Sequence, residues 1–574
     1  MGQRFSRERQ GSDAEHRATG PTMSSSNTNP INLFDELDRN LLRCPISDRQ
    51  FLPLNVLDEL ITADNVLASV NAAARRKSNA SQFSCNLKFA AGVVEKAKKL
   101  FAVLAFIGHE HAISDLLSEG LTDEDLPILR QPTMTRLSVE SRDSGSTTHK
   151  AFQSWKPQDF RHFENDQWLF LAPVFDSTGK HLKLTGECAF PFLSPSQRIR
   201  DSVNSEVVQC SVHPHHYRPL VGVPLSFVPS GRLNTHPSLQ TDQHQIQVAV
   251  KKIESRDAFE REIKNLNMIR ALKSRHIIKH IVTCERNSSY YVVFPWASGG
   301  SLLDLWRPEN DTARTPELVL WCLRQMLGLS DALRALHQDL EGGIHCRHGD
   351  LKPDNILLFE EGEDRFLVIA DLGVSRIHEQ PTELRQGGTT TKATTFSYQA
   401  PEASDEGNQD KPRHRTYDIW SLGCIFLEFV IWLLYDLKAV RNFGDHRQRR
   451  PQNPHRSFYQ TTNEGQVEPD AAVLDAISSL REDYRCGDDT ALGILVKLIA
   501  EKALVIPVEK RCNAEMLRNE LQKIVQSAEQ NFNSKNTSYL LKEPIHLALT
   551  PKIFGPAPRS LKSSRPDTPQ GEKG

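Results

Sequence analysis

Four polar residues in one short stretch have the types and spacing that moving a phosphoryl group would need. Asp350 and Lys352 lie two positions apart, Asn355 follows, and Asp371 comes directly after the next apolar run. Phosphoryl transfer needs little covalent help, so a protein contributes mainly positioning and charge. An aspartate can orient the attacking hydroxyl, a lysine can neutralise the moving group, and an amide with a second carboxylate can hold Mg²⁺.

Two segments before these residues have the patterns of a strand and a helix. Residues 248–250 are an apolar, β-branched run that ends at Lys251, which predicts a buried strand. Apolar residues recur at helical spacing over 259–269, which predicts an amphipathic helix that includes Glu262.

The order of several short motifs is more specific than any one of them. The chain reads HGDLKPDN at 348–355, DLG at 371–373, APE at 400–402 and DIWSLG at 418–423. This order resembles the catalytic half of a eukaryotic protein kinase. The resemblance covers residues 218–528 and implies an α+β, bilobal protein-kinase fold, with a small β-rich lobe and a large helical lobe.

The resemblance implies a role for each matching residue of the catalytic half. Asp350 would orient the substrate hydroxyl and accept its proton, and Lys352 would neutralise the phosphoryl group. Asn355 and Asp371 would hold Mg²⁺ against the phosphates. A lysine at 352 resembles the Ser/Thr branch, so we expect ATP- and Mg²⁺-dependent transfer to Ser and Thr hydroxyls of a protein substrate.

It also implies an ATP pocket. Lys251, braced by Glu262, would anchor the α- and β-phosphates, with Glu260 as the alternative brace. Phe294 would be the gatekeeper residue. Backbone groups near Pro295 and Ala297 would bond the adenine, although a proline can only accept there. Next to this segment, the pattern favours a helix that begins after Ser301 as its N-cap.

Four further residues would support the site. By the resemblance, His348 belongs to the catalytic loop, Asp418 fixes the backbone of that loop, and Glu402 pairs with Arg511 to tie the activation segment to the large lobe. Leu372, which stands where the family has Phe, would pack between His348 and Leu266.

Two departures from the family pattern favour a second hypothesis. Gly349 replaces the arginine that normally receives an activation-loop phosphate, which predicts that switching does not use that pair, even if Thr389–Thr391 or Thr394–Thr395 is phosphorylated. Residues 217–234 contain only Gly222 and Gly231, and no G-x-G-x-x-G loop. The alternative is therefore a weak or inactive pseudokinase that acts as a scaffold or switch.

The length and composition are typical of a multidomain protein. We expect it in the cytoplasm, with a nuclear location as the alternative. The chain has 574 residues and a net charge of −2, so it has no general attraction to nucleic acid. Its ten cysteines include no C-x-x-C, which argues against a disulfide or zinc framework. The apolar run 419–435 contains Glu428 and is interpreted as a buried core helix rather than a membrane span.

The first residues match a lipidation pattern. Gly2 lies in M-G-x-x-x-S and is followed by basic residues, so N-myristoylation is an open possibility beside a plain disordered leader. Membrane association would follow if Gly2 were modified.

Composition divides the rest of the chain. We expect a disordered leader at 1–30, a helical region at 31–130, a linker with a β-hairpin at 131–205, and a mostly disordered tail at 529–574. The hairpin would join 168–175 to 181–185. This layout resembles fungal kinases with a helical N-terminal region, which we expect to bind a protein partner.

Two polar segments are expected on the surface. Residues 441–470, which include the Arg447–Arg450 cluster, are predicted as a solvated loop, with substrate docking as the alternative. His213, His215 and His216 predict a solvated loop rather than a metal site.

Overall fold

The computed structural model describes most of the chain between residues 32 and 556. Its described ranges are 32–76, 85–130, 139–141, 145–147, 150–202, 205–218, 246–307, 313–340, 346–371, 376–377, 397–403, 415–448, 453, 456–462, 464–542 and 550–556. Gly2, Leu372 and the threonines at 389–395 lie outside them. The chain divides into two compact units, 1–41 with 55–170 and 42–54 with 171–574.

The N-terminal unit (1–41 with 55–170) is mostly helical, as the apolar periodicity predicts. Its helices are α1 (Leu33–Arg39), α2 (Leu54–Leu60), α3 (Ala63–Arg76), α4 (Leu87–Lys96), α5 (Lys98–Phe106), α6 (Ile113–Ser118) and α7 (Pro157–Asp166). Helix α5 is its centre, since residues 100–105 are all buried. The unit also has a small sheet of β3 (Leu129–Arg130), β4 (Val139–Ser141) and β5 (Gly145–Thr147). It extends to Phe170, beyond the predicted boundary at 130.

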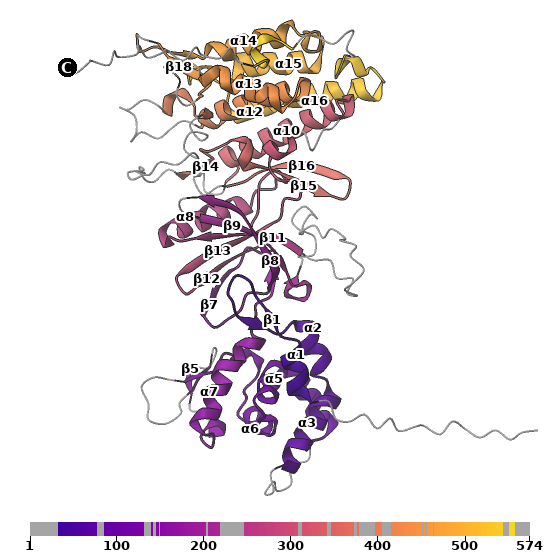
Figure 1. Cartoon of the computed structure of the whole chain (residues 1–574), viewed down its shortest axis with the longest axis vertical. Helices are drawn as coiled ribbons and strands as arrows, with labels where there is room; N and C mark the ends of the chain where they lie inside the picture. The colour runs from indigo at the N-terminus through magenta and orange to yellow at the C-terminus, as the bar shows by residue number, and fades with distance from the viewer. Residues whose placement is uncertain are drawn as a thin grey trace, which may run out of the picture. The chain divides into compact units, whose positions relative to one another are not determined.

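The C-terminal unit (42–54 with 171–574) begins with a lobe built on a six-stranded sheet, the sheet lobe (Figure 1). The strand order is β7 (His181–Leu184), β12 (Val282–Arg286), β13 (Ser289–Pro295), β11 (Ile246–Ile253), β9 (Ser205–Val212) and β8 (Phe192–Ser202). All neighbours are antiparallel except β7 and β12.

One face of this sheet packs against a cluster of buried apolar side chains. Side chains alternate along a strand, so Val248 and Val250 of β11 face one way and Lys251 the other. The valine face belongs to a cluster with Phe175, Phe190 and other buried residues. The segment 42–54 supplies Cys44 to this cluster, and its β2 (Gln50–Phe51) packs Phe51 on Ala172 and Ala189.

The predicted hairpin between 168–175 and 181–185 is wrong. Strand β6 (Phe175–Asp176) pairs with β10 (Tyr217–Arg218), and β7 pairs with β12. An alternating pattern predicts a strand but does not name its partner. Residues 181–202 therefore contribute two strands to the sheet lobe, which begins well before the predicted start at 218 and takes up part of the predicted linker.

Helix α8 (Arg256–Arg270) follows β11 after a two-residue connection, and the Ser255 side chain caps its N-terminus. It is amphipathic, as its sequence predicts, and buries Phe259, Leu266 and Ile269. Because this connection is short, only eleven positions along the chain separate Lys251 from Glu262.

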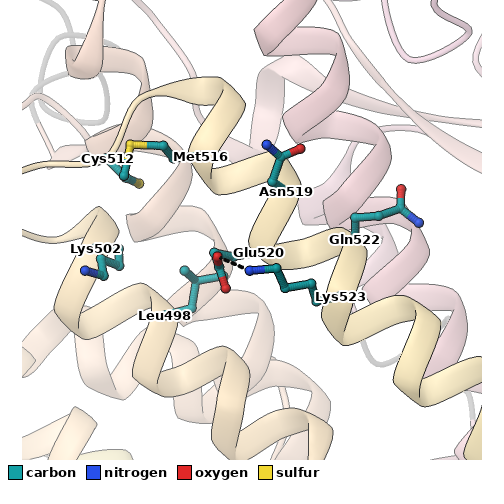
Figure 2. A pocket seen from close by; sticks show the side chains of 8 residues that line it. All are labelled: Leu498, Lys502, Cys512, Met516, Asn519, Glu520, Gln522 and Lys523. Carbon is teal, nitrogen blue, oxygen red and sulfur yellow. Dashed lines mark hydrogen bonds and ion pairs between the residues drawn. The ribbon is translucent and has the colours of Figure 1, made fainter.

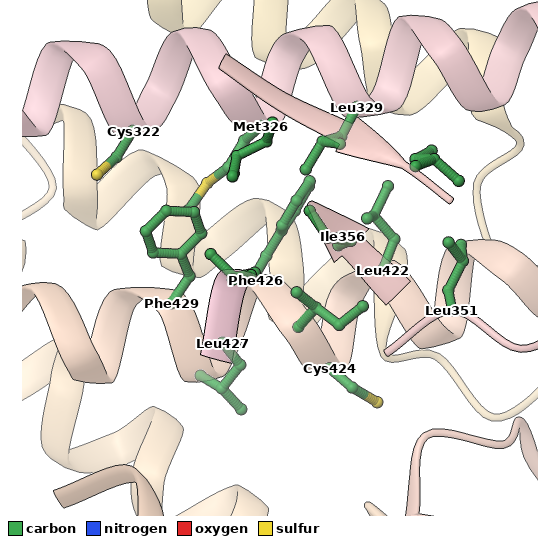
Figure 3. Packing of buried hydrophobic residues seen from close by; sticks show 14 of the residues in the cluster. Cys322, Met326, Leu329, Leu351, Ile356, Leu422, Cys424, Phe426, Leu427 and Phe429 are labelled. Carbon is green, nitrogen blue, oxygen red and sulfur yellow. The ribbon is translucent and has the colours of Figure 1, made fainter. Parts of the chain in front are cut away.

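The second lobe, the helical lobe, surrounds two long helices. Figure 3 shows side chains of α10 (Pro316–Gln338) and α12 (Thr416–Leu434) meeting in its core, among them Met326, Phe426 and Phe429. Helix α12 is the one described helix long and apolar enough to cross a membrane, and it is wholly buried. The prediction of a buried core helix is confirmed.

The remaining elements of this lobe are one more long helix near its C-terminal end and several shorter helices and strands. They are α9 (Leu302–Leu305), the hairpin β15 (Ile356–Glu361) with β16 (Asp364–Ile369), the pair β14 (Cys346–Arg347) with β17 (Arg376–Ile377), α13 (Leu437–Gln448), the hairpin β18 (Tyr459–Thr461) with β19 (Val467–Pro469), α14 (Ala471–Glu482), α15 (Ala491–Leu498), the π-helix η14 (Ile499–Ala503) and α16 (Ala514–Asn533). Ser301 caps α9 in a capping box, which confirms that prediction.

The solvated loop predicted at 441–470 is wrong for the residues that the structure describes. Arg447 is buried on α13, donates to Glu428 of α12 at 2.9 Å and stacks on Phe458. A buried charge is tolerated when a partner neutralises it. Arg447, Phe443 and Phe458 of this segment are therefore part of the core, whereas its β18–β19 hairpin is largely exposed. Phe554 in the predicted disordered tail is also buried, and its carbonyl accepts from Asn442.

Two of the three histidines predicted in a solvated loop are placed differently, whereas His215 is exposed as predicted. His213 and His216 are buried at the edge of the sheet lobe, where the His216 ring lies 5.3 Å from Phe51. Burial lowers the pKa of His213 to about 4, and that of His280 in the same lobe to about 4.

These two histidines predict an acid-sensitive sheet lobe. Between pH 6.5 and 4 the unfolded chain binds more protons, so each histidine should cost roughly 2 kcal/mol of stability by about pH 5. Thermal unfolding of the full chain from about pH 7.5 to 5 should show a falling midpoint. His280→Asn should reduce the slope, and exposed His162→Asn should not; an equal slope in both would contradict the prediction.

Candidate active site

A partly buried lysine is held by two carboxylates on the face of the sheet opposite Val248 and Val250. Lys251 Nζ donates to Glu262 Oε1 and Oε2 at 2.8 and 3.0 Å, and to Asp371 Oδ1 at 3.2 Å. Burial alone would lower the pKa of Lys251, but Asp371 and Glu262 raise it above its usual value, so the ammonium stays charged. The alternative brace, Glu260, is exposed and pairs with Arg256 instead.

A second polar cluster lies on the loop after β14. Lys352 Nζ donates to Asp350 Oδ2 at 2.8 Å, and Asn355 Nδ2 donates to the carbonyl and Oδ2 of Asp350 at 2.9 and 3.1 Å. Lys352 and Asn355 are almost fully buried, whereas Asp350 is half-buried. This arrangement fixes one carboxylate and places a cation beside it.

The loop that carries this cluster is held from below by Asp418 of α12. Asp418 accepts from the backbone N–H groups of His348 and Gly349 at 2.8 and 2.9 Å, and from His337 Nε2 at 2.9 Å. Burial would raise the pKa of Asp418, but the hydrogen bond to His337 and the electrostatic effects of His337, Arg347 and His348 together outweigh burial, so the pKa lies below its usual value. Gly349 has φ +82, a conformation that glycine adopts without strain.

The two clusters are linked through the backbone. The His348 ring contacts the carbonyl of Ala370 at 3.0 Å, and Asp371 follows at once with φ +60, a conformation that Asp and Asn tolerate better than most residues. Asp371 thereby reaches Lys251 while remaining next to the loop of Asp350.

Arg511 and Glu402 form a bidentate ion pair, with N–O distances of 2.8 and 3.1 Å. The Arg511 side chain is fully buried and also donates to the carbonyl of Thr416 at 3.0 Å. A bidentate, buried pair has one geometry, so it fixes the segment around Glu402 against α12.

The predicted adenine-binding segment is the end of β13. Phe294 is paired in register with Ala249 of β11, on the same face of the sheet as Lys251. Pro295 and Ala297 are buried, and the Ala297 carbonyl accepts from Gly300 N–H at 3.1 Å.

Sequence reasoning missed His337, which lies on α10 far from the motifs. Its ring is 3% exposed and contacts Asp418 directly. Its position on an apolar helix face gives no local signal that its partner is a carboxylate 81 residues later.

The residues present fit a divalent cation and a nucleotide. Asn355 and Asp371 offer an amide oxygen and a carboxylate, the hard donors that Mg²⁺ prefers. Within the described ranges no group of three or more His, Cys, Asp or Glu side chains could hold a metal by itself. Mg²⁺ usually keeps water and phosphate ligands, so two protein donors suit it.

Comparison with known proteins agrees with this geometry. The family model of the Protein kinase domain matches residues 233–468. The chain contains a eukaryotic-type protein kinase domain. Because β7, β8 and β9 precede residue 233, the kinase domain of this chain includes strands that the match does not reach.

Curated relatives of the kinase domain include fungal and amoebal enzymes. A calcium/calmodulin-dependent protein kinase, cmkA of Emericella nidulans, is 32% identical over 186 residues, 31% of this chain and 39% of that protein. Another of Metarhizium anisopliae is 31% identical over 160 residues, 28% of this chain and 37% of that protein. The serine/threonine-protein kinase 4 homolog B of Dictyostelium discoideum is 28% identical over 183 residues, 32% of this chain and 15% of that protein. The chain thus spans about two fifths or less of the relatives it matches.

Strands β8 and β9 place the position of a glycine-rich loop earlier in the chain than the expected segment, 217–234. Strands β8 and β9 pair up to Ser202 and Ser205, and β9 is the neighbour of β11. A glycine-rich loop would stand at this turn, and the sequence from 192 to 212 contains no glycine. The segment 217–234 follows both strands, so the expected location of the loop is wrong, and the glycine motif is missing from both places.

A surface hollow of about 530 Å³ lies elsewhere in the helical lobe of the kinase domain. Figure 2 shows Lys502 of η14 and Met516, Glu520 and Lys523 of α16 around it, with Lys523 paired to Glu520. None of the predicted site residues lines it.

Proposed function

We propose that this protein transfers the γ-phosphoryl group of ATP, with Mg²⁺, to serine or threonine hydroxyls of protein substrates. The observation that carries the proposal is the pairing of Lys251 with both Glu262 and Asp371 beside the Asp350–Lys352–Asn355 cluster. The relatives named as serine/threonine or calcium/calmodulin-dependent kinases support the same reaction class.

Each side chain would have a limited task. Lys251 would anchor the phosphates, and bound Mg²⁺ would neutralise their charge, with Asn355 and Asp371 as its protein ligands. Asp350 would accept a hydrogen bond from the substrate hydroxyl and then its proton. Lys352, already 2.8 Å from Asp350, would stabilise negative charge on the phosphoryl oxygens.

Nucleotide binding can be tested in the full chain by thermal unfolding. ATP with Mg²⁺ should raise the midpoint, because a ligand that binds only the folded state stabilises it by about 2.7 kcal/mol at 100 times Kd. Asp371→Asn should abolish the Mg²⁺-dependent part of the shift. Asparagine tolerates the positive φ at this position, so the variant tests the charge rather than the backbone.

The second candidate is a pseudokinase, favoured by the glycine-free β8–β9 turn. Glycines allow backbone N–H groups to approach phosphates closely, and their absence weakens such a lid. If millimolar ATP gives no shift with or without Mg²⁺, the transferase proposal fails and this candidate replaces it.

A further inference from the structure

Helix α8 is contacted by a segment that precedes the region matched by the family model. Residues 175–184, which we name the strap, contain β6, a turn and β7. Strand β7 adds a parallel edge strand beside β12, with the register His181 to Thr283 through Leu184 to Arg286. Figure 1 shows β7 at the β12 edge of the sheet.

The turn of the strap binds the last residue of α8. The Arg270 guanidinium donates to the carbonyl of Ser177 in the strap, and to the carbonyl of His280 at 2.8 Å. His280 is buried, and its Nε2 contacts the carbonyl of Gly179 at 3.1 Å. One arginine therefore joins the end of α8, the loop before β12 and the strap.

The strap is itself fixed to the sheet lobe. The Ser177 hydroxyl shares a 2.6 Å hydrogen bond with the Tyr217 hydroxyl, and both residues are buried. The Gly179 N–H donates to the carbonyl of Ile281 at 3.0 Å. A hydrogen bond from Arg270 to this turn thus connects α8 to a part of the lobe that has its own hydrogen bonds to the sheet and to Tyr217.

A second contact lies further along the same helix. The His181 ring is 5.8 Å from the Phe259 ring, which is 4.7 Å from Tyr290 of β13. Phe259 is three residues before Glu262, so both lie on neighbouring positions of α8. The strap therefore contacts α8 on both sides of the residue that braces Lys251.

Glycine is required at the centre of the strap. Gly179 has φ +76, and a Cβ there would lie 2.8 Å from Arg270 Nη1 and 2.8 Å from His280 Nε2. The close approach of the turn to Arg270 exists only because this side chain is absent.

We propose that the strap holds α8 in the position where Glu262 reaches Lys251, and that Arg270 is the positioning residue through which it does so. The first part of the sheet lobe would then control the phosphate anchor. The consequence for phosphoryl transfer rests on the proposed function, whereas the position of α8 can be measured without it.

The test is hydrogen–deuterium exchange of the full chain, read on backbone amides of α8. Arg270→Met removes the donors but keeps a long side chain, and we expect exchange in 259–269 to rise about tenfold or more, as for loss of a charged hydrogen bond. Exchange in α16 should stay unchanged. Arg270→Lys should restore part of the protection. Arg256→Met, at the exposed start of the same helix, should change nothing.

A matched pair of glycine variants tests the contact from the other side. Gly179→Ala and Gly362→Ala both place alanine at positive φ, but nothing lies within 4 Å of a Cβ at 362. Only Gly179→Ala should raise exchange in α8, by about tenfold. Equal α8 exchange in the two variants would overturn the proposal, even if Arg270→Met unfolds the whole sheet lobe.

The outcome separates this inference from the proposed function. Suppose that exchange in α8 is faster in Arg270→Met and Gly179→Ala but that ATP does not stabilise the wild-type protein. This result would support the strap proposal and contradict the proposed phosphoryl transfer. An ATP- and Mg²⁺-dependent shift with unchanged α8 exchange in all variants would do the reverse.

Discussion

Asp418→Ala is expected to destabilise the helical lobe strongly, whereas Asp350→Asn should leave its stability almost unchanged. Asp418 is fully buried and accepts from His348 N–H, Gly349 N–H and His337. Alanine leaves these donors buried without an acceptor, at a cost of about 3–5 kcal/mol. In a unit of this size the melting midpoint should fall by about 10 °C.

The stabilisation by Asp418 has a defined pH dependence. Its folded pKa is lowered, so its contribution is fully present above its unfolded pKa of about 4 and is lost as the pH falls through the folded pKa. The loss in Asp418→Ala should therefore be constant from about pH 5 upward.

Asp350→Asn keeps the shape of the side chain and an oxygen that can accept from Lys352 and Asn355. Its midpoint should stay within about 2 °C of the wild type. Turnover should fall by about 10²–10⁴ because the proton acceptor is lost. Asp354→Asn, the same chemical change in the same loop, is the control that should keep activity. Calorimetry and single-turnover transfer would measure both quantities, and a small loss of stability in Asp418→Ala would refute the structural role.

The catalytic loop could be predicted because its geometry is local. Asp350, Lys352 and Asn355 lie within six residues, and short backbone turns bring their side chains together. Helix α12 was equally clear, since a helix that is apolar all round must be buried.

Strand pairing could not be predicted because it depends on distant residues. Strand β8 is mostly polar after Leu193, and residues 213–245 separate its partner β9 from β11. Spacing along the chain therefore predicted the wrong place for the glycine-rich loop. Alternation in 181–184 indicated a strand correctly, but its partner is β12, a hundred residues later.

A buried charge also escapes sequence reasoning. Arg447 lies in a run of basic residues that has the composition of a solvated loop. Its partner is Glu428, one of the few acidic residues in an apolar helix. Only the fold brings the two together and removes both from water.

A chain that begins at residue 218 is expected not to fold. It lacks β7, β8 and β9, half of the six-stranded sheet, and β11 would lose its neighbour on one side. The buried face of Val248 and Val250 would lose Phe175, Phe190 and their neighbours. An exposed edge strand beside an apolar face promotes aggregation rather than folding. We expect no cooperative thermal transition from 218–574.

A chain that begins at residue 171 tests how much the segment 42–54 stabilises the sheet lobe. It retains all six strands but loses Phe51, Leu52 and Cys44, which are almost fully buried in the C-terminal unit. At about 1.5–3 kcal/mol for each large apolar side chain, its loss of stability should be about 5 kcal/mol. A chain that begins at 32 is the control and should unfold like the full protein. If 171–574 unfolded at the same midpoint as that control, the segment 42–54 would contribute nothing to the lobe. We therefore expect stability to decrease from the chain that begins at 32 to those that begin at 171 and 218, because each later start removes more buried contacts of the sheet lobe.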